Sequence, residues 1–201
     1  MFIVRLFKIF LLIAVFALNG CSIFSQEGFV PKILYIKLPE PNRIEFQGKG
    51  AGAGIALMSS MGPMGIAIGA AIDEGIAKDI REAAAQAGFN IQSSIETSVT
   101  EVLGDSYQLS FEQDQALYPR VEIKRYGFDS SGGGAEDLTH AKLRLVFMPS
   151  ANESETLNYP ADLNSEGEMK VPLSVLKKDG HQTLLLMENA LGQSFKNLLG
   201  K

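Results

Sequence analysis

This sequence has almost no cysteine, and it lacks the motifs that usually carry catalysis. The chain of 201 residues contains one cysteine and two histidines, His140 and His181, which are isolated from each other in sequence. A single thiol cannot close an intramolecular disulfide or build a multi-thiolate zinc site. Neither an H-E-x-x-H helix nor a G-x-S-x-G nucleophile turn occurs, and the D-x-D-x-D-G spacing of a calcium loop is missing. We therefore predict no catalytic residue, no metal site and no cofactor, so the chain is not expected to be an enzyme.

The first 21 residues have the order of a secretory signal. Arg5 and Lys8 come first, and an apolar run over residues 9–18 follows. The run is too short to span a bilayer. It ends in Leu18-Asn19-Gly20-Cys21. This Leu-x-Gly-Cys ending resembles the lipobox of bacterial lipoproteins.

The resemblance implies that the chain is processed and lipidated at Cys21. In bacterial lipoproteins the signal peptide, here residues 1–20, is cut off before the cysteine, a diacylglyceryl group is attached to the thiol, and the new amine is acylated. The membrane would then be a partner through acyl chains, palmitate among them, and the mature chain would have no free thiol. Ser22 stands where an aspartate tends to retain lipoproteins at the inner membrane. We therefore expect a lipid anchor in the outer membrane of a Gram-negative cell, with the protein facing the periplasm.

Basic residues are few and scattered. The chain has 18 Lys and Arg against 23 Asp and Glu, and removal of Arg5 and Lys8 with the signal peptide leaves 16 against 23, a net charge of −7. The densest basic pairs are Lys124-Arg125 and Lys177-Lys178. Nucleic acids and anionic lipids attract concentrated positive charge, so this composition argues against both as partners.

The mature chain is predicted to consist of a lipidated tether, residues 21–31, and a single domain, residues 32–201. Period-two alternation predicts strands at 32–38, 43–47, 107–111, 117–128, 141–148 and 156–161. Helical spacing predicts helices at 63–87, 92–103 and 181–199. The last helix has an apolar stripe formed by Leu184, Met187, Leu191, Phe195 and Leu198. Runs of strands separated from runs of helices predict an α+β fold, with an antiparallel sheet and helices packed on one face. This organisation loosely resembles that of other small α+β envelope lipoproteins.

A glycine-rich apolar segment covers residues 48–75. It contains eight of the chain's 20 glycines, and residues 51–72 carry no charge. Gly65 and Gly69 form a G-x-x-x-G pair, and a second row of small residues consists of Ala67, Ala71 and Gly75. Small residues at this spacing let helices approach closely, above all in lipid. Three interpretations remain open: a helix packed on the domain's own sheet, a segment that inserts into a membrane or self-associates, and a flexible flap.

Two weaker motifs lie in the same segment. Residues 48–53 match the G-x-G-x-x-A pattern of dinucleotide sites, and Asp73 follows 20 residues later. That pattern requires a helix directly after the glycines, whereas Pro63 indicates a later helix start. Met58, Met61 and Met64 have a spacing that suits soft copper ligands, but methionine also commonly fills irregular apolar contacts.

The leading hypothesis is therefore a non-enzymatic, lipid-anchored envelope protein that binds or helps to assemble an envelope component. The alternative is a glycine-zipper protein whose segment 48–75 inserts into the membrane or forms homo-oligomers there.

Overall fold

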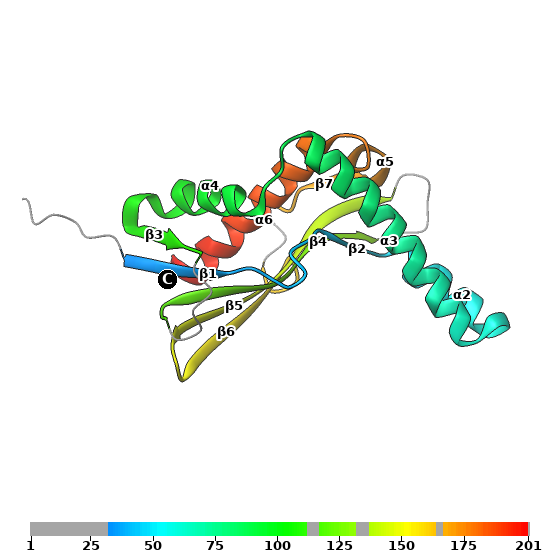
Figure 1. The fold of residues 1–201 in the computed structure, drawn as a ribbon, viewed down its shortest axis with the longest axis horizontal. Coiled ribbons are helices and arrows are strands. Elements are labelled where there is room, and N and C mark those ends of the chain that lie inside the picture. Colours follow the sequence, from blue (N-terminus) through cyan, green and yellow to red (C-terminus); the bar gives the residue numbers. More distant parts are fainter. Residues whose placement is uncertain (1–31, 112–116, 132–136, 164–166, 201) are drawn as a thin grey trace, which may run out of the picture. The chain divides into compact units, whose positions relative to one another are not determined.

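Helices and a mixed sheet form an α+β fold (Figure 1). The computed structural model describes residues 32–111, 117–131, 137–163 and 167–200. The predicted signal peptide, Cys21 and the predicted tether lie outside these residues. In chain order the elements are β1 (Lys32–Lys37), β2 (Glu45–Gln47), α2 (Lys49–Met61), α3 (Pro63–Gln86), α4 (Ile91–Leu103), the 3-10 turn η1 (Gly104–Ser106), β3 (Tyr107–Ser110), β4 (Arg120–Ser131), β5 (Leu138–Ser150), β6 (Glu153–Tyr159), β7 (Lys170–Pro172), α5 (Leu173–Leu176) and α6 (Gly180–Leu199).

The sheet is mixed, which corrects the purely antiparallel sheet expected from the sequence. Its strand order is β3-β1-β4-β5-β6, with β2 beside β4 and β7 beside β5. The pairs of β5 with β4, β6 and β7 are antiparallel, whereas β1 is parallel to β3 and β4, and β2 is parallel to β4. The helices α2, α3 and α4 connect β2 to β3 as a crossover, and such a connection returns the chain in the same direction.

Helices cover one face of the sheet. Along β5, alternate side chains are buried while those between them are half-buried or exposed, as expected for a sheet covered on one side only. α6 packs on this covered face against β5 and β6, and it also contacts α3 and α4. Within the apolar stripe of α6, Met187, Leu191, Phe195 and Leu198 are buried and Leu184 is half-buried.

Side-chain caps and one close backbone contact fix the helices of the body. The side chain of Asn90 accepts hydrogen bonds from two backbone N–H groups at the start of α4. Asp179 Oδ1 accepts the N–H of His181, at 3.0 Å, at the start of α6. A Cβ on Gly180 would lie 2.1 Å from the carbonyl oxygen of Ala83, so the start of α6 approaches α3 as only glycine allows.

α2 and the first half of α3 form a helical hairpin. No helix is predicted before Pro63 from the sequence, so α2 is a correction to that expectation. α2 packs on α3, and α3 continues past the hairpin to contact β2 and α6. In Figure 1 the hairpin extends beyond the end of the sheet. The hairpin therefore joins the rest of the domain at its base.

Candidate functional site

The glycine hairpin, defined as residues 49–72, begins at a turn that requires glycine. Gly48 has φ +144°, and a Cβ on it would lie 2.6 Å from the carbonyl oxygen of Ser130 in β4. Lys49 follows, and its Nζ lies 2.9 Å from Oδ2 of Asp137, whose side chain is 1% exposed. The turn and the ion pair fasten the start of α2 to the end of β4 and to the residue that precedes β5.

Asp73 of α3 caps the N-terminus of α2. Its Oδ1 accepts the N–H of Gly50 at 2.6 Å and its Oδ2 accepts the N–H of Gly48 at 3.3 Å. A carboxylate at this place is stabilised by the free N–H groups and by the helix dipole. The helix does open directly after the first glycine, at Lys49, contrary to the expectation of a later start. Because Asp73 occupies donors that a pyrophosphate would need, the G-x-G-x-x-A match reflects helix capping.

The two helices of the hairpin meet through glycines. Gly50 and Gly54 of α2 and Gly65 and Gly69 of α3 are all buried. A Cβ on Gly69 would lie 2.1 Å from the carbonyl oxygen of Gly50, and one on Gly65 would lie 2.6 Å from the backbone nitrogen of Met58. Real Cβ atoms do not approach a backbone so closely, so this contact depends on glycine. Gly65 and Gly69 therefore pack on α2. The interpretation of a helix packed on the domain's own sheet would have placed them against the sheet instead.

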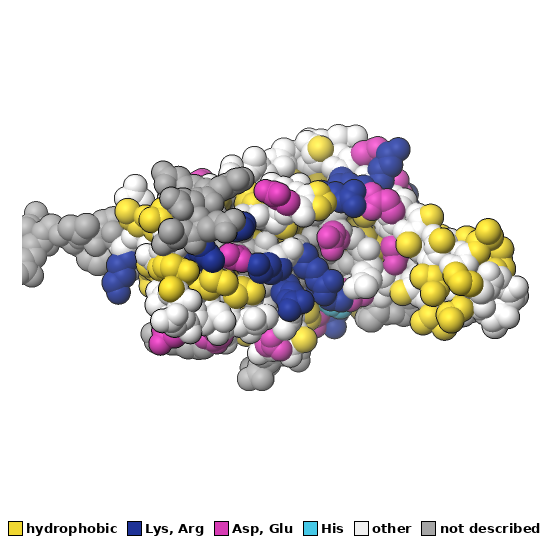
Figure 2. Space-filling view, turned by 60° about the horizontal axis from the view of Figure 1, so that its bottom comes forward, with side chains coloured by type: hydrophobic (Ala, Val, Ile, Leu, Met, Phe, Trp, Pro, Cys, Tyr) yellow, Lys and Arg dark blue, Asp and Glu magenta, His cyan; other side chains and the backbone are white. Residues whose placement is uncertain are grey.

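Most of the large apolar side chains of the hairpin are exposed, whereas Leu57 and Ile68 are half-buried. Six of them have exposed fractions between 39% and 71%: Ile55, Met58, Met61, Met64, Ile66 and Ile72. Figure 2 shows apolar side chains gathered over this end of the molecule. The second row of small residues, Ala67, Ala71 and Gly75, is exposed as well, and a Cβ on Gly75 would meet nothing within 4 Å. The structure thus brings Gly65 and Gly69 into the helix contact and leaves the second row on the surface.

Several polar groups at the tip of the hairpin form hydrogen bonds within it. The hydroxyls of Ser59 and Ser60 donate to backbone carbonyls three residues earlier, at 3.0 and 3.2 Å. The N–H of Gly62 donates to the carbonyl of Met58 at 2.9 Å. Pro63 then opens α3 without an N–H of its own. These side-chain and backbone groups therefore have partners within the hairpin.

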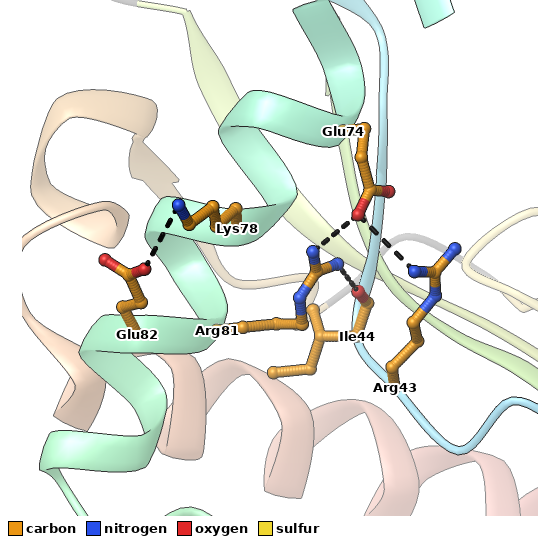
Figure 3. Close-up of polar contacts among 6 residues, drawn as sticks. All are labelled: Arg43, Ile44, Glu74, Lys78, Arg81 and Glu82. Carbon is orange, nitrogen blue, oxygen red and sulfur yellow. Dashed lines mark hydrogen bonds and ion pairs between the residues drawn. The ribbon is translucent and has the colours of Figure 1, made fainter. Parts of the chain in front are cut away.

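A charged network holds the second half of α3 at the base of the hairpin (Figure 3). Arg81 donates to the carbonyl of Ile44 at 3.0 Å and to Oε1 of Glu74 at 2.6 Å. Arg43 lies 3.4 Å from the same carboxylate oxygen. The hydrogen bond from Arg81 lowers the pKa of Glu74 below its ordinary value. The network ties α3 to the chain that enters β2.

The two histidines lie on different elements. Nδ1 of His140 in β5 lies 3.6 Å from Oε1 of Glu168, and burial lowers the pKa of His140. His181 is exposed in the first turn of α6. In the described part of the chain, no group of three or more His, Cys, Asp and Glu side chains is arranged to hold a metal ion.

Neither the comparison with known proteins nor the length of the helices indicates a function. Within the described ranges, every helix is too short or too polar to cross a membrane. No protein-family model matches the sequence, and no curated protein is significantly similar to it.

Proposed function

We propose that this chain is a lipid-anchored protein of the bacterial outer membrane, with a binding or assembly role, whose glycine hairpin inserts its tip into one leaflet of the bilayer. The observation that carries the proposal is the inverted packing of the hairpin. Glycines fill the contact between its helices, and six of its eight large apolar side chains are exposed. Helices that pair in water bury their large apolar side chains against each other, whereas helices that pair in lipid rely on the close approach of small residues.

Transfer of the tip into lipid removes a hydrophobic penalty. Full burial of an Ile or Met side chain is worth roughly 1.5–3 kcal/mol. The six outer side chains of the hairpin are 39% to 71% exposed, so lipid would recover about 1 kcal/mol from each of them. The sum is several kcal/mol, and the internally bonded Ser59 and Ser60 hydroxyls add little cost against it.

The length of the hairpin fits one leaflet. α2 has 13 residues, which corresponds to a length of about 20 Å at roughly 1.5 Å per residue. A bilayer with its headgroups is about 40–45 Å thick, so one leaflet with its headgroups offers about 20 Å. A hairpin of this length reaches the middle of the bilayer without crossing it.

Charges define the depth at which insertion would stop. The uncharged stretch covers residues 51–72, with Lys49 before it and Asp73 after it. The hydrogen bond between Asp73 and Gly50 places the two ends of this stretch at the same level. Lys49, Asp73 and the Glu74 network would then lie near the headgroups while the apolar tip lies below them.

A single added tryptophan measures the insertion, because the chain has no tryptophan of its own. Met64→Trp places the probe at the tip, and Leu185→Trp places it at an exposed apolar position of α6 as a matched control. The processed, lipidated protein is reconstituted into vesicles whose phospholipid chains carry bromine. We expect strong quenching of the Met64→Trp emission and weak quenching of the Leu185→Trp emission.

Two outcomes would contradict insertion. Equal, weak quenching at both positions would mean that the tip stays in water. A blue-shifted Met64→Trp emission without quenching by bromine would mean that protein covers the tip, as in the homo-oligomer or in a complex with an envelope component.

The lipid anchor has a test of its own. Cys21→Ala should abolish incorporation of labelled palmitate, since the thiol is the acceptor that the lipobox resemblance implies. The Met64→Trp variant serves as the labelled control. Unchanged labelling of the Cys21→Ala variant would refute the anchor without bearing on the hairpin.

A further inference from the structure

The open face of the sheet gathers positive charge, although the mature chain is acidic overall. Lysines and arginines on this face come from β1, β4 and β5: Lys37, Arg120, Lys124, Arg125, Lys142 and Arg144. Figure 2 shows Lys and Arg side chains gathered in the middle of a face on which the apolar hairpin is also visible. The scattered basic residues of the sequence argue against an anionic-lipid partner, but folding brings them together from three strands.

Two arginines in this patch face each other directly. Arg125 of β4 and Arg144 of β5 are register partners, next to an irregularity in the pairing between Ile123 and Arg125. Both are exposed, and within the described residues neither is joined to an acidic side chain by a hydrogen bond or ion pair. Like charges directly opposite each other destabilise a sheet. The pair is therefore a positive site that an anion would neutralise.

Three neighbouring cations of the patch already have an acidic partner. Glu122 forms ion pairs with both Arg120 and Lys124. Lys142 Nζ lies 2.6 Å from Oδ2 of Asp129. Arg125 and Arg144 differ from these three cations, since they lie opposite each other without such an ion pair in the described part of the chain.

A pocket of about 280 Å³ connects Arg125 to the base of the glycine hairpin. Its charged lining consists of Arg43, Arg125 and Lys142 and of Glu45, Asp73 and Glu74. The carboxylate of Asp73 accepts two backbone N–H groups, and that of Glu74 binds two arginines. Arg125 is the lining cation for which the described residues supply no such partner.

We propose that Arg125 and Arg144 bind the phosphate of an anionic phospholipid headgroup at the membrane surface. This inference rests on the proposed insertion of the hairpin and names the lipid that the inserted protein selects. The pocket adjoins Asp73, where the uncharged stretch ends, so insertion of the tip brings Arg125 to the level of the lipid phosphates. Guanidinium groups present paired donors that match phosphate oxygens. The bilayer beside the site makes a lipid phosphate the better fit than a free anion.

The same tryptophan reporter tests the selection. The processed Met64→Trp protein is placed in phosphatidylcholine vesicles with a minor share of phosphatidylglycerol, and bromine is carried either by the phosphatidylglycerol or by an equal amount of the phosphatidylcholine. The ratio of the two quenching values reports how strongly the anionic lipid is enriched around the hairpin. A basic side chain near an anionic surface strengthens binding by about fivefold, so we expect an enrichment of about fivefold or more from the two arginines. Arg125→Gln with Arg144→Gln should bring the ratio close to one.

A matched double variant controls for total charge. Lys178→Gln with Lys196→Gln removes two exposed cations from the helical side of the domain and should keep the enrichment of the parent. A ratio near one in the parent, with strong quenching by both lipids, would overturn lipid selection while the insertion of the hairpin stands. No quenching in any variant would instead refute the insertion on which the inference rests.

Two further results would overturn the assignment. Undiminished enrichment in the arginine double variant would show that the anionic lipid binds at residues other than Arg125 and Arg144. Inorganic phosphate that binds to the parent and not to the arginine variant, combined with equal quenching by the two lipids, would assign the site to a free anion.

Discussion

The two halves of α3 are held by opposite kinds of contact. In residues 63–72 the helix touches α2 through glycine backbones, and its large apolar side chains lie outside. In residues 73–86 the inward face is apolar, with Ile76, Ala77, Ile80, Ala83 and Ala84 buried, and the charged side chains lie outside. The second half follows the rule for helices in water and the first half follows the rule for helices in lipid. Asp73 marks the change within one continuous helix.

This difference separates the stability of the body from that of the glycine hairpin. The body is held by apolar side chains that α3, α4 and α6 bury together over the sheet. The hairpin is held by a narrow backbone contact and by three polar attachments at its base, those of Lys49, Asp73 and Glu74. Regions with few buried apolar contacts open locally at lower free energy than the core. Damage to the body should therefore unfold the protein, while damage to the hairpin should open only the hairpin.

The largest expected effect belongs to the body. Leu191 of α6 is fully buried, and Leu191→Ala should lower the free energy of unfolding by about 2–5 kcal/mol, through lost burial and the cavity left behind. Urea denaturation of the parent and the variant measures the difference. Leu185→Ala, in the same helix but 48% exposed, should stay within about 0.5 kcal/mol of the parent. Equal midpoints for Leu191→Ala and the parent would mean that the stripe of α6 does not hold the body together.

The next effect compares one substitution at two glycines of α3. Gly69→Ala places a Cβ against the backbone of Gly50 and should open the hairpin, whereas Gly75→Ala meets open space. Alanine at position 75 should stabilise the helix by up to about 1 kcal/mol. Gly69→Ala should therefore destabilise the hairpin, whereas Gly75→Ala should stabilise α3 without changing the contact between the helices.

Amide hydrogen exchange separates the two glycine variants. In Gly69→Ala, amides of α2 should lose protection while those of α6 keep it. In Gly75→Ala, protection of α3 should rise or stay the same. Loss of protection throughout the domain in Gly69→Ala would mean that the hairpin and the body form one cooperative unit, contrary to the comparison.

The sequence predicts the body better than the hairpin. Apolar spacing together with Pro63, Gly88 and Gly104 places α3 and α4 within a residue or two, because their side chains bury in a common core. α2 is missed because Gly50, Gly52 and Gly54 each disfavour a helix in isolation. Close packing against α3 compensates at Gly50 and Gly54, which have no open space for a side chain. The G-x-x-x-G spacing of Gly50 and Gly54 was the available signal, since it equals that of Gly65 and Gly69.

Two further features depend on long-range pairing and are not readable from local patterns. The parallel pairing of β1 follows from the helical crossover, and strand alternation does not report direction. The facing of Arg125 and Arg144 follows from the register of β4 and β5 after the irregularity beside Arg125. Such an irregularity shifts which side chains meet, so a pairwise contact could not be inferred from the sequence.

A smaller effect is expected at the cap of α2. Asp73→Ala removes the carboxylate that accepts the N–H groups of Gly48 and Gly50, and a lost N-cap typically costs about 1 kcal/mol. The loss should appear as lower hydrogen-exchange protection in the first turns of α2. Asp79→Asn is the matched control in the same helix, because Asp79 pairs with Lys177 and not with α2. Equal protection of α2 in both variants would show that the cap does not stabilise the hairpin.

The smallest effect is a pH dependence at the border between the two regions. Arg81 holds the pKa of Glu74 below its ordinary value of 4.5. As the pH falls, the unfolded chain therefore takes up this proton before the folded chain does. The stabilisation from Glu74 is complete above pH 4.5 and is lost as the pH falls through the lowered pKa of the folded state. Because the Glu74 side chain is 52% exposed, the contribution should stay within about 0–1 kcal/mol and weaken in salt.

Glu74→Gln should accordingly reduce the loss of stability on acidification below pH 4.5, measured by urea unfolding across that range. Comparison with the parent is essential, because burial raises the pKa of Glu188 and that group changes stability in the opposite direction. Glu82→Gln is the control, since Glu82 lies 3.8 Å from the exposed Lys78 in the same helix and points away from Arg43 and Ile44 (Figure 3). If both variants follow the parent, the Arg81–Glu74–Arg43 network orients the base of the hairpin without stabilising it. If Glu74→Gln alone reduces the loss of unfolding free energy at low pH, the network stabilises the body. The border at Asp73 then also separates the two halves of α3 in their stability.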